Sequence, residues 1–345
     1  MDVSRIFVAG LGAVTPAGWT VSAMREALDR GEPLPAQLLD PRREKPLLAR
    51  VVPNPTTRPD FLSHPRLRRA SAITHYAASA ALEAIAGFRR ANPQSGRIGL
   101  IACLQSGCVQ YSCRFYDETL KNPATASPLL FPETVYAAPS SHIAALLENV
   151  ILVNSLVGDP SAFLQGVSLG AQWLAEDRVD ACLVVGAEEI NWITADALWH
   201  LDRTASASAG AGALCLCREP GLSIGVELAA ITDAHTYSAN KSRNQAARSM
   251  RDQFNGIASH TSRELLCDGL GNGVRANAPE ISAWKDWAGP RISPKRILGE
   301  GLMAAAAWQC VAACDAVANQ RCTTANVSLV GFNQQAIGAK FQAMQ

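Results

Sequence analysis

Thiols and imidazoles are the side chains of this sequence best suited to nucleophilic and acid–base chemistry. The 345 residues include 10 Cys and 6 His. A cysteine at a helix N-terminus can attack an acyl group, and a histidine can move the proton that such a reaction releases. The composition therefore supplies the side chains of a covalent catalytic site, and their spacing decides whether such a site forms.

Two glycine motifs suggest other chemistry but lack the context that it needs. Gly10-Leu11-Gly12 begins like a dinucleotide fingerprint, yet Thr15 stands at the third glycine position and Pro16 follows it. Gly166–Gly170 has the G-x-S-x-G spacing of a hydrolase nucleophile elbow, which requires a strand before the serine and a helix after it. Here Ser168 is expected within a helix, so the glycines are interpreted as packing contacts.

Neither the cysteine pairs nor the arginine cluster predicts a site. Cys215 and Cys217 share one face of an expected strand, and Cys310 and Cys314 share a helix face, but no second pair stands at zinc spacing. We therefore expect buried thiols, no metal site and no cofactor. A basic cluster is typical of a solvated face, and this one could also contact an acidic carrier protein: Arg66, Arg68 and Arg69.

The charge balance excludes the usual nucleic-acid binder. Lys and Arg number 31 and Asp and Glu number 30, which leaves a formal charge of +1. No apolar run reaches the roughly 18–20 residues of a membrane span, and the N-terminus lacks the layout of a signal peptide. We expect a cytoplasmic protein without a membrane span, whose cysteines are reduced thiols.

Strand and helix patterns alternate along the chain, which favours an α/β fold. Residues 33–66 have no periodicity and are expected to form a surface excursion. The expected strands are Arg5–Ala9 (closed by Gly10), Arg97–Cys103, Val150–Val157, Asp180–Val185, the paired Ala211–Cys217 and Ser223–Ile231, Glu264–Cys267 and a final Val327–Phe332. The expected helices are Thr20–Asp29, His75–Phe88, His142–Asn149, Pro160–Asp177 and Gly301–Asn319, with a loop and helix in 235–262.

Several segments, in order along the chain, together resemble the β-ketoacyl synthases, the thiolase-fold condensing enzymes of fatty-acid and polyketide assembly. They are Val8–Gly18 (VAGLGAVTPAG), Ser127-Pro128 with Phe131–Ile143 (FPETVYAAPSSHI), Asp180–Glu188 (DACLVVGAE), Ala209–Leu216 (AGAGALCL), Lys295–Gly299 (KRILG) and Val330–Phe332 (VGF). The resemblance implies a thiolase-like α/β fold of two similar halves in a layered αβαβα core. The halves are expected at 1–220, with a degenerate nucleophile helix, and at 221–345, in one compact unit.

The family's nucleophilic cysteine is missing. It begins a buried helix, and counting without gaps from His142 or back from Gly186–Glu188 places its position on Pro160 in both cases. Asp159 as N-cap and Pro160 in the first turn suit a helix start. Proline, however, has neither a nucleophile nor the N–H that the family's oxyanion hole uses.

The two histidines that assist decarboxylation in the family are also replaced. The first falls on Asp268, or on Gly269 if the register shifts by one, and the second falls on Glu300. A carboxylate there would repel the malonyl group and the enolate. Lys295 and Phe332 are retained, although the glycines that follow the family's phenylalanine are not.

An inactive synthase-like chain of this kind resembles the chain length factors. These pair with an active ketosynthase as a heterodimer and limit the acyl chain that grows on an acyl carrier protein, which contacts mainly the partner. The resemblance implies a tunnel-lining segment within Gly107–Tyr116, followed by a loop, with these candidate residues: Val109, Tyr111, Ser112, Phe115 and Phe131. Ordinary interface packing is the alternative for each of them.

Two further expectations follow from the resemblance. The chain is short between Leu201 and Ala209, which is similar to the compact chain length factors of aryl polyene pigment clusters. The alternative function is an active acyltransferase or condensing enzyme whose displaced nucleophile is Ser161, although neither motif retains a histidine to activate it.

Overall fold

The strands of the computed structural model form one long mixed sheet, flanked by helices on both faces. The structure describes residues 5–39, 46–92, 96–256 and 263–344. Along the sheet the order is β12 (Arg291–Ile292), β11 (Glu264–Cys267), β13 (Thr324–Val330), β14 (Gln335–Ala343), β9 (Val226–Ile231), β1 (Ile6–Val14), β8 (Gly210–Cys217), β6 (Ala181–Glu188), β4 (Ile98–Leu104) and β5 (Val150–Val157), and β10 (His235–Thr236) pairs with β14. A smaller sheet joins β2 (Gln37–Leu38), β3 (Leu48–Arg50) and β7 (Ala207–Ser208).

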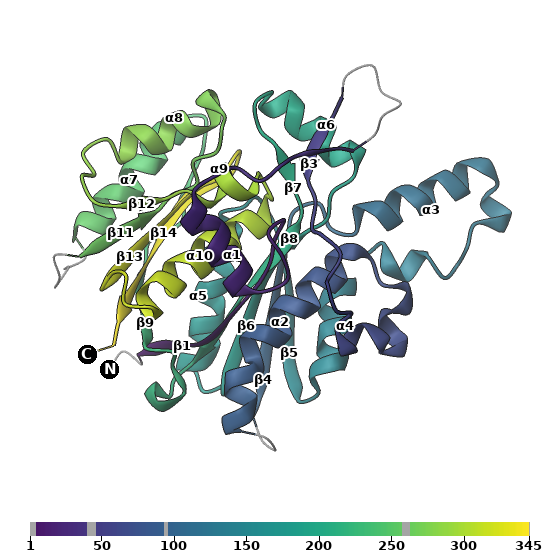
Figure 1. Cartoon of the computed structure of the whole chain (residues 1–345), viewed down its shortest axis with the longest axis horizontal. Coiled ribbons are helices and arrows are strands. Elements are labelled where there is room, and N and C mark those ends of the chain that lie inside the picture. Colours follow the sequence, from purple (N-terminus) through teal and green to yellow (C-terminus); the bar gives the residue numbers. More distant parts are fainter. Residues whose placement is uncertain (1–4, 40–45, 93–95, 257–262, 345) are drawn as a thin grey trace.

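The helices form outer and central layers around the sheet. In chain order the α-helices are α1 (Val21–Arg30), α2 (Ala72–Ala91), α3 (Val109–Lys121), α4 (Ala138–Leu147), α5 (Ala162–Ala175), α6 (Trp192–Leu201), α7 (Arg243–Gly256), α8 (Val274–Ala283), α9 (Pro294–Leu298) and α10 (Met303–Ala318). In Figure 1, α7 and α8 cover the strands at one end of the sheet and α2 and α4 cover those at the other, with α5 and α10 between them. This confirms the expected layered thiolase-like α/β core.

The central position of α10 follows from its sequence. Every residue from Met303 to Val317 is buried, and most of them are alanine or another small apolar residue. A helix that is apolar all round is stable only when neighbours enclose it. It packs against β6 and β8 and also against β11 and β13. These two pairs of strands lie on opposite sides of β9 and β1 in the sheet order, so α10 contacts both halves of the sheet.

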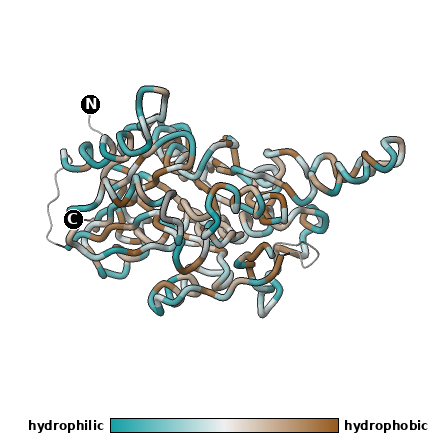
Figure 2. Tube along the Cα trace, turned by 90° about the horizontal axis from the view of Figure 1, so that it is seen from above, coloured by the Kyte–Doolittle hydropathy of each residue, from teal (hydrophilic) through white to brown (hydrophobic). Residues whose placement is uncertain are grey.

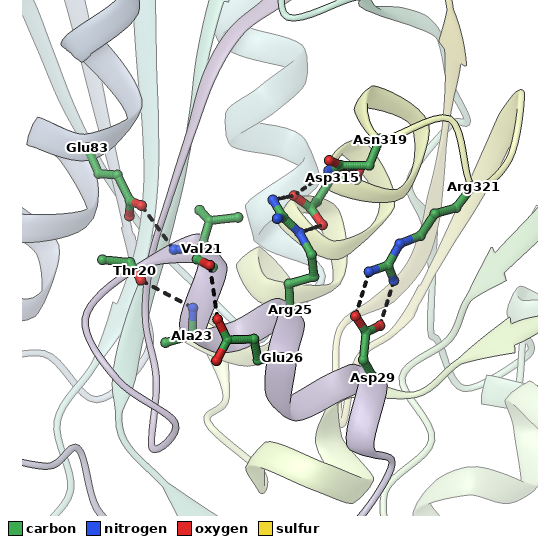
Figure 3. A network of polar contacts seen from close by, with 11 residues as sticks. Thr20, Val21, Ala23, Arg25, Glu26, Asp29, Glu83, Asp315, Asn319 and Arg321 are labelled. Carbon is green, nitrogen blue, oxygen red and sulfur yellow. Dashed lines mark hydrogen bonds and ion pairs between the residues drawn. The ribbon is translucent and has the colours of Figure 1, made fainter.

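Helix α1 is tied to two of these layers by side chains. Glu83 of α2 accepts the Val21 N–H at 3.0 Å, and Arg25 donates to both Asp315 oxygens, at 2.6 and 2.8 Å, at the end of α10. Figure 3 shows these contacts, together with the Thr20 hydroxyl that caps the helix. The charged face of α1 is thereby fixed against the core.

Strand β1 runs past the glycine that was expected to close it. A Cβ on Gly10 would lie 2.0 Å from the Ala84 carbonyl oxygen, and one on Gly12 would lie 1.9 Å from that of Ala80. Both glycines therefore let the backbone of α2 lie directly on the strand. The Gly-x-Gly pair is therefore explained by the close packing of α2 on the strand and not by a dinucleotide-binding turn.

Three other expectations are corrected. The strands near 211–217 and 223–231 lie in one sheet, but β1 lies between β8 and β9 and pairs with both of them. The expected last strand is followed by a further strand, β14, whose residues up to Phe341 are buried. The excursion at 33–66 contributes β3, whose Ala49 and Arg50 are buried against β7, although 40–45 lie outside the described residues.

Most helices lie where they were expected, with shifted ends. The helix from Pro160 begins two residues later, as α5, and the helix from His142 begins at Ala138. Gly166 and Gly170 of α5 face Cys103 and Cys182, which confirms that they are packing contacts. The helix expected in 235–262 is α7, whose last described residue is Gly256. Residues 257–262 of the expected range lie outside the described residues. No helix in the described part of the chain is long and apolar enough to span a membrane.

The boundary at residue 220 stays a prediction. In space, however, the first five strands of the sheet order, from β12 to β9, all come from residues after 220. The five from β1 to β5 all come from residues before it. Pairing between β1 and β9 involves three residue pairs, from Ile6 with Leu228 to Val8 with Val226.

Candidate functional site

A small polar cavity brings together several of the positions that the sequence singled out. Lys295, Glu300, Phe332 and Gly269 line it, along with residues that include Glu280 and Asp202. Its volume is about 30 Å³, which is room for little more than one water molecule. An acyl chain does not fit in a space of this size.

Lys295 and Glu300 form a buried ion pair in this cavity. Lys295 lies in α9, and its Nζ is 2.8 Å from Glu300 Oε2, while the two side chains are only 8% and 10% exposed. The other oxygen of Glu300 accepts the Leu302 N–H at 3.0 Å. The Nζ also lies 5.6 Å from the centre of the Phe332 ring. The carboxylate is thus neutralised within the chain, and the retained lysine already has a counterion.

The loop after β11 contains both alternatives for the first histidine position and places them differently. Gly269 lines the cavity, whereas Asp268 does not. The Asp268 carboxylate is fully buried and accepts the Ser293 hydroxyl at 2.6 Å, with Arg291 3.6 Å away. Burial raises the pKa of this carboxyl. The position that faces the cavity is therefore Gly269, which has no side chain to offer.

Glu280 fills the space in front of Gly269. Its carboxylate oxygens each lie 3.1 Å from the Gly269 N–H that they accept, and a Cβ on Gly269 would lie 3.1 Å from Oε2. Burial raises the pKa of Glu280 to about 7, and the charge of Asp268 adds to the shift. A carboxylate thus lies where a side chain at position 269 would extend.

Sequence reasoning missed Glu280 and its neighbour Asn277. The Asn277 side chain donates to the Gly271 carbonyl at 2.9 Å and accepts the Gly271 N–H at 3.1 Å, which holds the glycine loop in place. The available signal was their spacing, because residues three apart share a helix face. Two polar residues at that spacing in α8, directly after a glycine-rich loop, are expected to face the loop.

The turn before α5, where the nucleophile position was expected, contains Asp159, Pro160 and Ser161. All three residues are buried. Pro160 precedes the first helical residue, Ala162, by two positions, and Asp159 lies outside the helix, so the expected N-cap at Asp159 is corrected. The Asp159 carboxylate accepts the Ser161 N–H at 3.2 Å and also the Ser161 hydroxyl in a very short contact.

The same carboxylate reaches the loop that carries Phe332. Its Oδ2 accepts the Gln334 N–H at 3.0 Å and the Asn333 N–H at 3.4 Å. The Asp159 N–H donates in return to the Gln334 side chain at 3.0 Å. The amides that follow Phe332 are therefore directed at an internal carboxylate.

Cysteines and histidines do not contribute to the cavity. Among the residues that the structure describes, none of either type lines it. All ten cysteines are free thiols, and nine of them are buried, as expected for packing residues. Burial raises the pKa of Cys217 to about 11 and that of Cys108 to about 12, which keeps both thiols protonated at neutral pH.

The five tunnel candidates lie apart from this cavity. Four of them are half-buried on α3, and Phe131 in the following loop is 57% exposed, with its ring 5.5 Å from that of Phe115. Helix α3 extends away from the body of the protein in both Figure 1 and Figure 2. The structure brings Phe115 and Phe131 together but places neither of them at the Lys295 cavity.

Two adjacent carboxylates fix the turn from which α3 starts. Glu188 accepts the Gln105 and Ser106 N–H groups, and Glu189 accepts the Gln110 N–H at 2.7 Å. Burial raises the pKa of Glu188 to about 8 and that of Glu189 to about 6, although the accepted amides oppose both shifts. The end of β6 thereby sets the direction of α3.

No family model and no curated protein matches this chain. Solved structures match it over its whole length. A β-ketoacyl synthase from Burkholderia phymatum has a TM-score of 0.84 at 15% identity, with 99% of this chain and 100% of that chain covered. The ishigamide ketosynthase/chain length factor has a TM-score of 0.82 at 17% identity, with both chains fully covered (100% each).

A third match comes from AntDE:AntF, a type II PKS acyl-carrier protein in complex with its ketosynthase bound to the hexaketide. Its TM-score is 0.79 at 14% identity, and 99% of each chain is covered. Matches of this extent at such low identity reflect a shared backbone arrangement. The chain therefore has the thiolase-like fold of the ketosynthases, which is also the fold of a ketosynthase/chain length factor.

Proposed function

We propose that this chain is a catalytically inactive chain length factor that pairs with an active β-ketoacyl synthase and limits the acyl chain built on an acyl carrier protein. One observation carries the proposal: the nucleophile position is Pro160, in a turn whose neighbouring donors bind Asp159. No thiol is present there to accept an acyl group, and proline offers no N–H to a developing oxyanion.

The cavity supports the same conclusion. A decarboxylating site needs neutral donors around the carboxylate that leaves and the enolate that forms. Here Glu280 and Glu300 line a space of about 30 Å³, and Lys295 is paired with Glu300. The two carboxyl side chains, which occupy the cavity in place of neutral donors, and the small volume both disfavour binding of a malonyl extender.

An exposed sheet edge offers a surface for the partner. Strand β5 ends the sheet order, and its Ile151, Val153 and Val157 are 53%, 49% and 52% exposed. Unpaired strand edges with apolar side chains readily pair with another chain. Helix α3 adds two more exposed apolar side chains, Tyr116 and Leu120, which are 64% and 67% exposed. We infer that this edge joins the sheet of the ketosynthase.

In this arrangement α3 regulates the partner's product. Helix α3 extends away from the body of the protein (Figure 2), which supports a contact of its candidate residues with the other subunit. Aromatic bulk at Tyr111, Phe115 and Phe131 would close the far end of an acyl tunnel. The gate therefore acts between subunits, and the acyl carrier protein docks mainly on the ketosynthase.

Some finer features of the proposal depend on the sequence alone. These are the aryl polyene class, the cytoplasmic location and a contribution to carrier docking from the exposed arginines of residues 65–69. Arg66, Arg68 and Arg69 lie at the end of a short helix that begins at Pro65, where they are available to an acidic partner.

The rival function is acyl transfer by Ser161. One observation favours it, because the Ser161 hydroxyl donates to Asp159, a possible base. Two observations oppose it. Ser161 has no exposed surface, and the neighbouring Asn333 and Gln334 N–H groups are bound to that same carboxylate. The inactive-subunit proposal accounts for both.

Co-expression with a ketosynthase from the same source tests the proposal directly. We expect the two chains to co-purify as a heterodimer that makes products of defined length. Separate elution of two stable chains would contradict the pairing. The purified chain alone, incubated with acyl-loaded carrier protein, should gain no mass by mass spectrometry, while the ketosynthase serves as the positive control. Stable acylation that Ser161→Ala abolishes would support the rival function instead.

A further inference from the structure

The Asp159 carboxylate is held by donors from two separate segments of the chain. Ser161, at the start of α5, donates its N–H and its hydroxyl. The loop after β13 supplies the N–H groups of Asn333 and Gln334, at 3.4 and 3.0 Å. Asp159 is only 2% exposed, so these groups replace the water that a carboxylate would otherwise bind.

The hydrogen-bond donors around the Asp159 carboxylate, among the described residues, include no positively charged side chain. The described residues form no ion pair with Asp159, so its charge is balanced by neutral hydrogen-bond donors and by the N-terminal end of a 14-residue helix. Backbone N–H groups arranged in this way form an anion-binding concavity. The carboxylate also lies directly against Gly331, where a Cβ would be 2.0 Å from Oδ2.

The loop is fixed independently of Asp159. The Tyr237 hydroxyl lies 2.9 Å from the Gly331 carbonyl oxygen and 2.8 Å from that of Gln335, on both sides of the donor residues. Removing the carboxylate should therefore leave the two N–H groups in place. They would still point at the vacated position.

We propose that the start of α5 and loop 331–334 form an anion site of the oxyanion type, and that Asp159 permanently occupies it. The inference rests on the proposed function, since it identifies a second barrier to catalysis. The proline removes the nucleophile, and the aspartate fills the place of the negative oxygen that a tetrahedral intermediate would develop. Restoring a thiol at position 160 alone would leave that place occupied.

Rescue by a small carboxylate tests this assignment. We would measure the melting temperature of the full-length Asp159→Ala variant in sodium formate and in sodium chloride at equal ionic strength and pH 7, where formate is ionised. A vacated site should bind formate, and at ten times the dissociation constant the melting temperature should rise by about 2 °C or more relative to chloride. Wild-type protein should show no such difference.

Two variants serve as matched controls. Asp159→Asn fills the same volume with a neutral amide, so it should not respond to formate. Asp315→Ala removes another buried carboxylate, one that is bound by Arg25 at the far end of α10, and it reports any general effect of formate on a destabilised chain. A formate effect on Asp159→Ala no larger than that on Asp315→Ala overturns the assignment.

If Asp159→Ala does not fold in chloride, its far-ultraviolet circular dichroism is followed during refolding. Recovery of the native signal in formate but not in chloride supports the anion site, and equal failure in both salts overturns it. Neither measurement uses the ketosynthase or the carrier protein. A failed heterodimer would therefore contradict the proposed function without affecting this test.

Discussion

Lys295 and Glu300 are joined in a buried ion pair, with Nζ 2.8 Å from Oε2, inside the small polar cavity beside Gly269. Each residue supplies the counterion of the other, and neither side chain is more than 10% exposed. The pair therefore stabilises the fold, which leads to the first prediction.

Breaking this pair should destabilise the fold strongly. Glu300→Ala leaves the Lys295 ammonium buried without its partner, so we expect a loss of about 3 kcal/mol in the free energy of unfolding, measured by urea denaturation. Replacing both residues, in Lys295→Met/Glu300→Leu, should recover most of that loss. The exposed pair Arg321–Asp29 provides the control, since Asp29→Ala should cost less than about 1 kcal/mol. Equal losses at the two pairs would contradict the prediction.

Stability should fall as the pH rises from about 5 to about 8. Burial raises the pKa of Glu188 from 4.5 to about 8 in the folded chain, so the folded state holds this proton more tightly than the unfolded chain does. The stability that the proton provides is complete below the unfolded value and is lost as the pH rises through the folded value.

The measurement is the free energy of unfolding from urea titrations at several pH values. Glu188→Gln removes the titrating group but keeps an oxygen for the Gln105 N–H, so its profile should be flatter over this range. Glu176→Gln, on the surface, should keep the wild-type slope. A wild-type profile that rises between pH 5 and 8 would show that the carboxyl is ionised throughout.

Smaller side chains on α3 should lengthen the products. Phe115→Ala and Tyr111→Ala, made one at a time, remove bulk from the proposed gate, and we expect products longer by at least one extension unit from the co-purified heterodimer. Liquid chromatography with mass spectrometry gives the length distribution. Arg114→Ala, on the exposed side of the same helix, should leave it unchanged. An unchanged distribution from stable heterodimers of both variants removes these residues from the gate.

A charge on the exposed edge strand should prevent pairing with the ketosynthase. Val153→Lys places an ammonium on β5, where joining the partner's sheet would desolvate it. We expect loss of the heterodimer in size-exclusion chromatography while the chain itself stays folded. Leu38→Lys changes a side chain of similar exposure (49%) on the small sheet and should leave pairing intact. A normal heterodimer with Val153→Lys would locate the interface elsewhere.

The sequence by itself determined the α/β class and most of the helices. Strands such as Val150–Val157 and Glu264–Cys267 were predicted with their observed bounds, because short apolar runs between polar turns reflect local propensity. The replacement of catalytic residues at Pro160 and Glu300 stays a prediction, which depends on spacing within one ordered set of motifs.

Only the tertiary structure decided which groups meet. The insertion of β1 between β8 and β9, the contact of Gly269 with Glu280 and the contact of Asp159 with Gln334 each join segments from different elements of the chain. Such contacts depend on the packing of whole layers, which no local pattern encodes. The same reason explains why Glu280 was missed: its role arises from burial beside Gly269, and burial is a property of the assembled core.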